Sequence, residues 1–129
     1  MALQYSVTVR NAQLDAVETT VGTAPLLRIY SGSAPANCAA AASGTLLAEA
    51  TLPSDWMAAA SSGSKALSGT WQDASANATG TAGHWRLYDS SGTTCHAQGT
   101  VTATGGGGDM TLDNTSIASA QSVTITSFT

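Results

Sequence analysis

The fold class rests on the stretch Ala82-Gly83-His84-Trp85-Arg86-Leu87-Tyr88-Asp89, in which large apolar and polar side chains alternate. An alternation with a period of two is typical of a β-strand whose two faces meet different surroundings. Residues 90–92 read Ser-Ser-Gly and predict a turn, and residues 94–102 resume a strand pattern. These two segments therefore predict a β-hairpin.

Further strand-like segments lie on both sides of this hairpin. They are short, rich in Leu, Ile, Val and Thr, and separated by Gly, Ser and Pro; they cover residues 26–30, 45–52, 65–71, 109–112 and 122–128. Residues 54–60 follow Pro53 and predict one or two helical turns anchored by Trp56. Many short strands with regular turn signals indicate a mainly β protein, an antiparallel β-sandwich or jelly-roll-like domain.

The N-terminal segment follows a helical pattern instead. Ser6 suits an N-cap, and Gly22 stands where a helix would end. Asp15 and Glu18 are expected to face solvent. Apolar residues recur at spacings of three and four: Leu14, Val17 and Val21. The sequence therefore predicts an N-terminal helical arm over residues 1–22 and a single β-sandwich domain over residues 23–129.

The composition indicates a chain that associates with other chains. Ala, Gly, Ser and Thr supply 72 of its 129 residues, and charged residues supply 9%. Ordinary soluble domains carry about 25% charged residues. A surface with so few charges is poorly protected against association, so we expect a homo-oligomer.

The same composition excludes several classes of function. The four cations, Arg10, Arg28, Lys65 and Arg86, are scattered along a chain of net charge −4, which argues against nucleic-acid binding. No apolar run approaches the ~18–20 residues that span a bilayer, so no membrane partner is expected. The first residues lack the basic and apolar regions of a secretory signal.

No motif in the sequence requires a catalytic, metal or cofactor site. The glycine run at residues 105–108 leads into the acidic segment that begins at Asp109, whereas a phosphate-binding loop leads into a helix. His84 and His96 lie on the two strands of the hairpin, but their spacing matches no metal-ligand pattern. Asp109 and Asp113 favour turn capping over paired acid–base chemistry.

Two cysteines are too few for a disulfide framework. Cys38 and Cys95 are interpreted as two reduced thiols packed as small apolar side chains. A single bridge between them, formed in an oxidising environment, is the alternative.

Four apolar residues are candidates for an interface with a partner. Three come from the predicted helix and one from the segment after Pro53: Leu14, Val17, Val21 and Trp56. Trp56 is a candidate because aromatic side chains dominate the binding energy of many interfaces.

Several motifs, taken together, resemble a family of small proteins encoded by tailed bacteriophages and prophages. They begin at Met1 (Met-Ala-Leu-Gln-Tyr-Ser-Val), Asp15 (Asp-Ala-Val-Glu-Thr-Thr), Arg28 (Arg-Ile-Tyr-Ser-Gly-Ser-Ala-Pro-Ala-Asn-Cys), Leu52 (Leu-Pro-Ser-Asp-Trp-Met), Gly83 (Gly-His-Trp-Arg-Leu) and Gly105 (Gly-Gly-Gly-Gly-Asp-Met-Thr-Leu). The resemblance covers nearly the whole chain. It implies a capsid decoration, or cement, protein with a jelly-roll-like β domain and no catalytic residues.

The resemblance also implies partners and a location. The expected partners are the major capsid protein and further copies of this chain, as a dimer or trimer, on the capsid surface after synthesis in the bacterial cytoplasm. The helical arm is expected to become ordered on a neighbour. Two alternatives stay open: a tail or head–tail structural protein, and a virion carbohydrate-binding or hydrolytic module that uses an exposed tryptophan beside paired acids.

Overall fold

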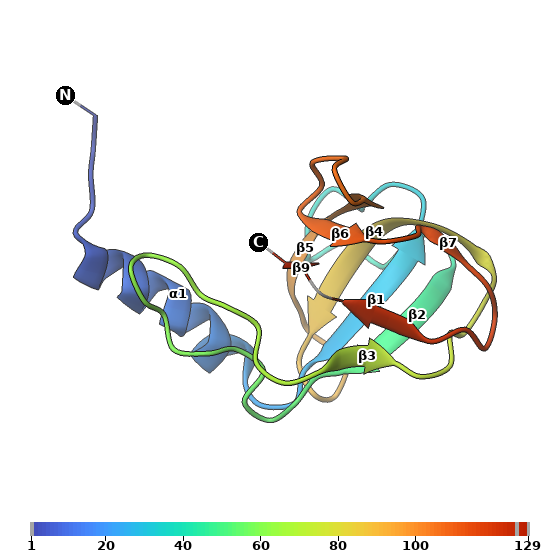
Figure 1. The fold of residues 1–129 in the computed structure, drawn as a ribbon, viewed down its shortest axis with the longest axis horizontal. Coiled ribbons are helices and arrows are strands. Elements are labelled where there is room, and N and C mark those ends of the chain that lie inside the picture. The colour runs from blue at the N-terminus through green and yellow to red at the C-terminus, as the bar shows by residue number, and fades with distance from the viewer. Residues whose placement is uncertain (1, 126, 129) are drawn as a thin grey trace.

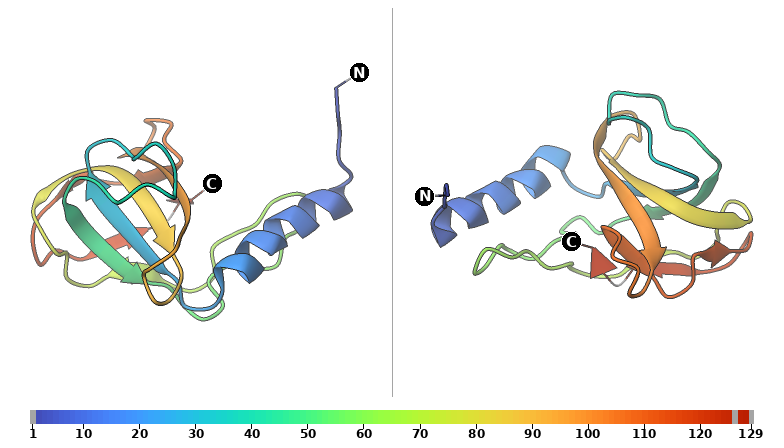
Figure 2. Two further views of the ribbon diagram at one scale, coloured as in Figure 1. Left: turned by 180° about the vertical axis from the view of Figure 1, so that it is seen from behind. Right: turned by 90° about the horizontal axis from the view of Figure 1, so that it is seen from above.

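The computed structural model describes residues 2–125 and 127–128, which form a mainly β protein with a curled mixed sheet and one N-terminal helix (Figure 1). In chain order the elements are α1 (Val7–Val21), β1 (Leu26–Ser31), β2 (Leu46–Thr51), β3 (Trp71–Asp73), β4 (Gly80–Tyr88), β5 (Cys95–Ala103), β6 (Met110–Leu112), β7 (Ser116–Ile117), β8 (Val123–Ile125) and β9 (Ser127–Phe128). The helix projects away from the β domain, with the N-terminus at its far end (Figures 1 and 2).

One sheet wraps around the core of the β domain. Its strand order is β2-β1-β4-β5-β6-β9, with β7 paired to the start of β4. A second sheet, of the two strands β3 and β8, adjoins β2 on one side and β6 on the other, so it closes the open side of the curled sheet. The predicted hairpin is confirmed, because β4 and β5 pair antiparallel with Leu87 opposite Ala97.

Both faces of the central strands are buried, which explains why the second half of β4, residues 84–88, carries a large side chain at every position. One face, including Ile29 of β1, Trp85 and Leu87, belongs to the apolar core. The other face carries His84 and Arg86, which are also buried. The period-two alternation therefore separates an apolar interior from a second, polar layer that the loop at residues 32–45 covers on the outside of the sheet.

The prediction of a purely antiparallel sheet is wrong at β6, and a jelly-roll sandwich is not confirmed. Strands β5 and β6 pair in parallel, with Val101 opposite Met110. Only residues 104–109 connect them, and the glycine run makes this tight return possible. A Cβ on Gly106 would lie 2.7 Å from the Thr102 side chain, and Gly105 and Gly107 have φ angles of 87° and 79°. Glycine is therefore required here for backbone geometry.

The predicted helical turns at residues 54–60 are also wrong, and the predicted strand at residues 65–71 is found only in part, as a bridge at Leu67 and the start of β3 at Trp71. Residues 57–67 instead double back as a two-stranded excursion, which we call the ribbon. Met57 bridges Leu67, the amide of Ala58 donates to the carbonyl of Ala66 (2.9 Å), and Ser61 pairs with Ser64 at the tip. Pairing between the two halves of the ribbon provides the backbone hydrogen bonds that a helix would have made internally.

Both predicted helix ends are confirmed. The Ser6 side chain accepts a hydrogen bond from the amide of Val9, and the amide of Gly22 donates to the carbonyl of Glu18. Gly22 has a φ of 91°, a conformation that side chains with a Cβ rarely adopt, so the chain can leave the helix and turn towards β1.

Two tryptophans join the helix end and the ribbon to the β domain. The indole N–H of Trp56 donates to the carbonyl of Gly22 (3.0 Å), and that of Trp71 donates to the carbonyl of Trp56 (3.0 Å). Their rings pack 5.7 Å apart and tilted by 44°. Trp56 is 0% exposed, so it lies wholly inside the subunit. The prediction that Trp56 belongs to an interface is therefore wrong, and Trp56 is an internal anchor.

Replacing Trp56 tests this anchor. We expect Trp56→Ala to lower the free energy of unfolding by roughly 3–5 kcal/mol, because it removes a fully buried aromatic side chain. Trp56→Phe keeps most of the packing but leaves the Gly22 carbonyl without its donor, which costs roughly 1–3 kcal/mol. Guanidinium denaturation of the two variants measures both values. Stability within about 0.5 kcal/mol of wild type for Trp56→Ala contradicts the anchor.

Candidate functional site

The candidate functional site is the projecting part of the molecule. It consists of the arm, which we define as residues 2–21, and the ribbon beside it. The two segments run side by side away from the β domain, as both views in Figure 2 show. The tryptophan pair fixes their common base, since Gly22 ends the helix and Trp56 enters the ribbon.

A buried lysine bridges the ribbon and the helix. The Lys65 side chain is 3% exposed, and its Nζ lies 2.7 Å from Asp15 Oδ1 and 2.8 Å from Glu18 Oε2. Asp15 Oδ1 also accepts a hydrogen bond from the amide of Ala60 (3.0 Å). The prediction that Asp15 and Glu18 face solvent holds only in part: the Asp15 side chain is still 48% exposed, but both carboxylates also pair with this cation of the ribbon.

A second pair of contacts holds the tip of the ribbon. The amide of Gly63 donates to Asn11 Oδ1 (2.8 Å). The Arg10 guanidinium packs on the same glycine, since a Cβ placed there would lie 3.0 Å from Arg10 Nη1. The helix is therefore held along its length by polar contacts, although its sequence offers little helix propensity on its own.

These contacts shift the pKa values of the charged pair. The hydrogen bond from Lys65, and then that from the amide of Ala60, lower the pKa of Asp15 below its ordinary value. Burial alone would lower the pKa of Lys65, but its bonds to Asp15 and Glu18 outweigh that effect and raise it. Both groups are therefore charged at neutral pH, which keeps the ribbon attached to the helix.

The exposed apolar side chains gather on the arm. In the part of the chain that the structure describes, every large exposed hydrophobic residue falls between residues 3 and 17: Leu3, Tyr5, Val7, Val9 and Val17. Leu3 is 80% exposed and lies in the extended segment before the helix. Scattered exposed apolar residues need no explanation, but their confinement to one projecting segment marks a surface for association.

The four predicted interface residues divide between surface and interior. Val17 is exposed on α1, and Leu14 is half-buried on the same helix. Val21 is buried in the core, so, like Trp56, it is corrected to an internal residue. The helical spacing predicted the helix correctly. Apolar residues at that spacing indicate that one face of a helix is covered, but they do not indicate whether the same subunit or a partner covers it.

A hollow of about 280 Å³ separates α1 from the β domain. Its lining comes from the helix and from one residue of β5: Gln13, Ala16, Val17, Thr20, Val21 and His96. A second hollow, of about 430 Å³, lies at the far end of the arm between Leu3, Gln4, Tyr5 and Arg10. Sequence reasoning missed Leu3 and Tyr5, because they precede the helix and follow no periodic pattern.

The two histidines and the paired aspartates do not form sites of their own. His84 is buried, its Nδ1 lies 2.8 Å from the carbonyl oxygen of Gly32, and its ring stacks on Tyr30. His96 instead lines the hollow beside α1. Asp109 Oδ2 accepts from the amide and the hydroxyl of Thr100, and these bonds lower the pKa of Asp109. Among the described residues, no cluster of three metal-ligating side chains occurs.

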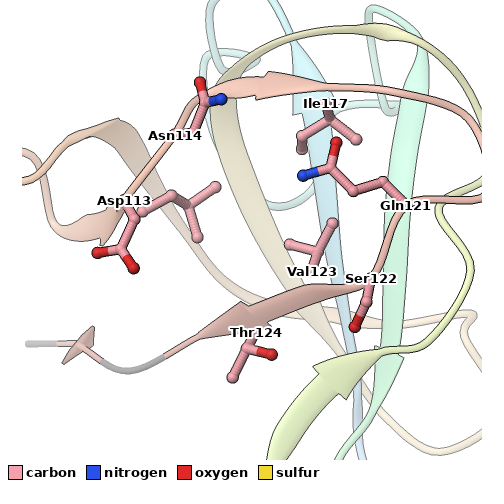
Figure 3. A pocket seen from close by; sticks show the side chains of 8 residues that line it. Asp113, Asn114, Ile117, Gln121, Ser122, Val123 and Thr124 are labelled. Atoms are coloured by element: carbon pink, nitrogen blue, oxygen red, sulfur yellow. The ribbon is translucent and has the colours of Figure 1, made fainter.

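A shallow pocket of about 190 Å³ lies between β6, β7 and β8 (Figure 3). Val123 and Ile117 point towards each other across it, whereas Thr124 points to the other side of β8. Its polar groups are engaged in turns: Gln121 Oε1 accepts from the amide of Ala118, and Asn114 Oδ1 accepts from that of Ser116. These polar groups therefore act in local structure.

Comparison of the chain with family models, curated proteins and solved structures gives no match. No helix in the described part of the chain is both long and apolar enough to cross a membrane.

Removing the buried cation tests the attachment of the ribbon. We expect Lys65→Met to speed hydrogen exchange at the amides of Ala60 and Gly63 by on the order of tenfold, because Asp15 and Glu18 lose their partner. Lys65→Arg, which keeps the charge, is the matched control and should change exchange less. Unaltered exchange in Lys65→Met would mean that the contacts around Asn11 hold the ribbon by themselves.

Acid should release the same contact. A carboxylate whose pKa is lowered on folding stabilises the fold above its unfolded pKa, and this contribution is lost as pH falls through the lower folded value. We therefore expect the Ala60 amide resonance to stay constant from pH 7 to about pH 5 and to move below about pH 4. NMR titration measures this, and Asp15→Asn should abolish the transition. A midpoint above the ordinary aspartate pKa contradicts the ion pair.

Proposed function

We propose that this chain is a structural protein of a tailed-bacteriophage virion, a capsid decoration protein that self-associates and binds the major capsid protein on the capsid surface. The observation that carries the proposal is that, among the side chains the structure describes, the large exposed apolar ones are confined to the projecting arm. The resemblance of the motifs to a phage and prophage family supplies the biological setting. In this setting the curled β domain takes the part of the jelly-roll-like domain that the resemblance implies.

The dimensions of the arm suit a contact between neighbouring subunits. A helix of 15 residues is roughly 22 Å long, and the extended residues before it add to that reach. The N-terminus lies at the end of the arm farthest from the β domain (Figure 1), and Leu3 and Tyr5 belong to the exposed segment between it and the helix, where a neighbour is most accessible. An arm that reaches across a lattice gains avidity because every subunit repeats the same contact.

Contacts within the subunit favour a helix that is formed before the arm meets a partner. Lys65, Asn11 and the Trp56 indole hold the helix in place within a single subunit. This differs from the expectation that the helix becomes ordered only on a neighbour. A preformed arm loses less conformational entropy on binding, which favours association from a modest contact area.

The alternative of a carbohydrate-binding module receives less support. Such a module stacks sugar rings on exposed aromatic side chains, whereas Trp56, Trp71 and Trp85 are all buried. A tail or head–tail role uses the same arm and the same chemistry, so it is separated from decoration by copy number in the particle.

The test is the copy number of the chain in purified virions, measured by quantitative mass spectrometry against the major capsid protein. A simple lattice ratio to the capsid protein supports decoration. A few copies, or a ring-like number, moves the protein to the tail or neck, and absence from the particle overturns both structural proposals.

Apolar residues of the arm should control binding and self-association together. We expect the triple change Leu3→Ser, Tyr5→Ser and Val17→Ser to reduce occupancy on particles by on the order of tenfold or more, because it removes exposed apolar contacts without touching the core. Light scattering should also show a smaller species in solution.

The matched control changes exposed alanines of the β domain, Ala74→Ser and Ala118→Ser. It should leave occupancy and solution mass unchanged. Unaltered occupancy in the arm variant, with the fold intact by circular dichroism, contradicts the role of the arm.

A further inference from the structure

The loop at residues 32–45 is attached to the outside of the sheet almost entirely by hydrogen bonds. Its residues are exposed or half-buried, so it contributes no side chain to the apolar core. The side chains that hold it come from β4 and β5 and reach its backbone carbonyls: His84 reaches Gly32, Gln98 reaches Pro35, and Arg86 reaches Cys38 and Ala40, all within 2.9 Å. These contacts fix the position of the loop backbone over the hairpin.

Arg86 fixes Cys38 itself. Arg86 is 1% exposed, and its Nη2 donates to the Cys38 carbonyl at 2.8 Å and to that of Ala40 at 2.9 Å. It forms no ion pair with the described carboxylates, so loop carbonyls and the ring of Tyr88, 5.5 Å away, are its partners. Burial of an unpaired guanidinium is costly, so its N–H groups must find acceptors. The hydrogen bond to the Cys38 carbonyl therefore holds the backbone of this cysteine against the sheet.

Cys95 lies directly beside this point. It begins β5 opposite Tyr88, and both cysteines line one hollow of about 220 Å³ together with Arg86 and Thr93. The Cys95 thiol donates to the carbonyl of Ala97 (3.3 Å), and its side chain is near enough to Cys38 to raise the pKa of the Cys38 thiol. Both thiols are half-buried and face this hollow, so a small reagent in solution can reach them.

We infer that Cys38 and Cys95 form a modification site, at which oxidation by a low-molecular-weight disulfide closes an intramolecular bond that fixes the 32–45 loop to β5. The inference rests on the juxtaposition of the two thiols and is independent of the proposed function. A disulfide requires its two Cα atoms within about 7 Å, which the attachment of the loop by Arg86 and Gln98 favours.

The chemistry is two successive exchanges. The Cys95 thiol loses its proton to solvent and its sulfur attacks the reagent disulfide, which forms a mixed disulfide and releases one thiolate. The Cys38 thiol then loses its proton as its sulfur attacks the Cys95 sulfur, which forms the internal bond, breaks the bond between Cys95 and the reagent sulfur, and releases the second thiolate. Two protein thiols are thereby oxidised and one reagent disulfide is reduced to two thiols, which take up the protons.

The order of attack follows from the surroundings of Cys38. Burial, with the neighbouring Cys95 side chain adding to it, raises the pKa of the Cys38 thiol to about 11. It therefore stays protonated at neutral pH, and the first attack falls to Cys95.

The experiment treats the native, full-length chain with oxidised glutathione and follows intact mass and free thiols. We expect loss of two hydrogens from the mass and loss of both free thiols, without a retained glutathione. The closed form should melt roughly 10 °C higher than the reduced form, because the bond constrains a long segment of the unfolded chain.

Single variants separate closure from ordinary thiol reactivity. Cys38→Ser should retain one glutathione on Cys95, since the resolving thiol is gone, and the double variant should gain no stability from the reagent. The reagent is checked on the unfolded chain, where both thiols react. Stable glutathione adducts on the wild-type chain, a disulfide between two chains, or two unreacted thiols in the native chain would each overturn the inference.

Discussion

The burial of Trp56 against Trp71 is the interaction on which both parts of the molecule depend. Each indole donates its N–H to a backbone carbonyl, Trp56 to Gly22 and Trp71 to Trp56. The first bond holds the end of the helix, and the second joins the two ends of the ribbon. Since a buried indole must find an acceptor, these bonds set the place where the arm leaves the β domain.

From that base outward, polar contacts replace apolar packing. The ribbon has no large apolar core of its own, and Lys65 joins it to Asp15 and Glu18 of the helix. This leaves the apolar side chains of the arm free to point outward. The helix is thus held mainly by polar contacts while the side chains from Leu3 to Val17 named above stay exposed, which is the property that a preformed association surface requires.

On the outside of the sheet, polar contacts again hold a segment in place without apolar packing. Arg86, His84 and Gln98 hold a loop of small residues by its backbone carbonyls, so its attachment to the sheet depends on the strands more than on the loop's own side chains. Cys38 adds a side chain of chemical interest, because it lines the same hollow as Cys95. The hairpin of β4 and β5 therefore organises the apolar core on one face and this polar layer on the other.

The sequence by itself determined the local structure: the helix between Ser6 and Gly22, the hairpin of β4 and β5, and most strand positions. Caps, turns and side-chain alternation act over a few residues, so they can be read from neighbours in the chain. Only the tertiary structure decided that residues 54–60 form no helix, that β6 pairs in parallel and that Trp56 is internal. Those outcomes depend on partners distant in the chain, such as Lys65 for Asp15 and Trp71 for Trp56. Composition and spacing do not specify which distant groups meet, because the same apolar or charged residue is satisfied equally by a core, a neighbouring segment or another subunit.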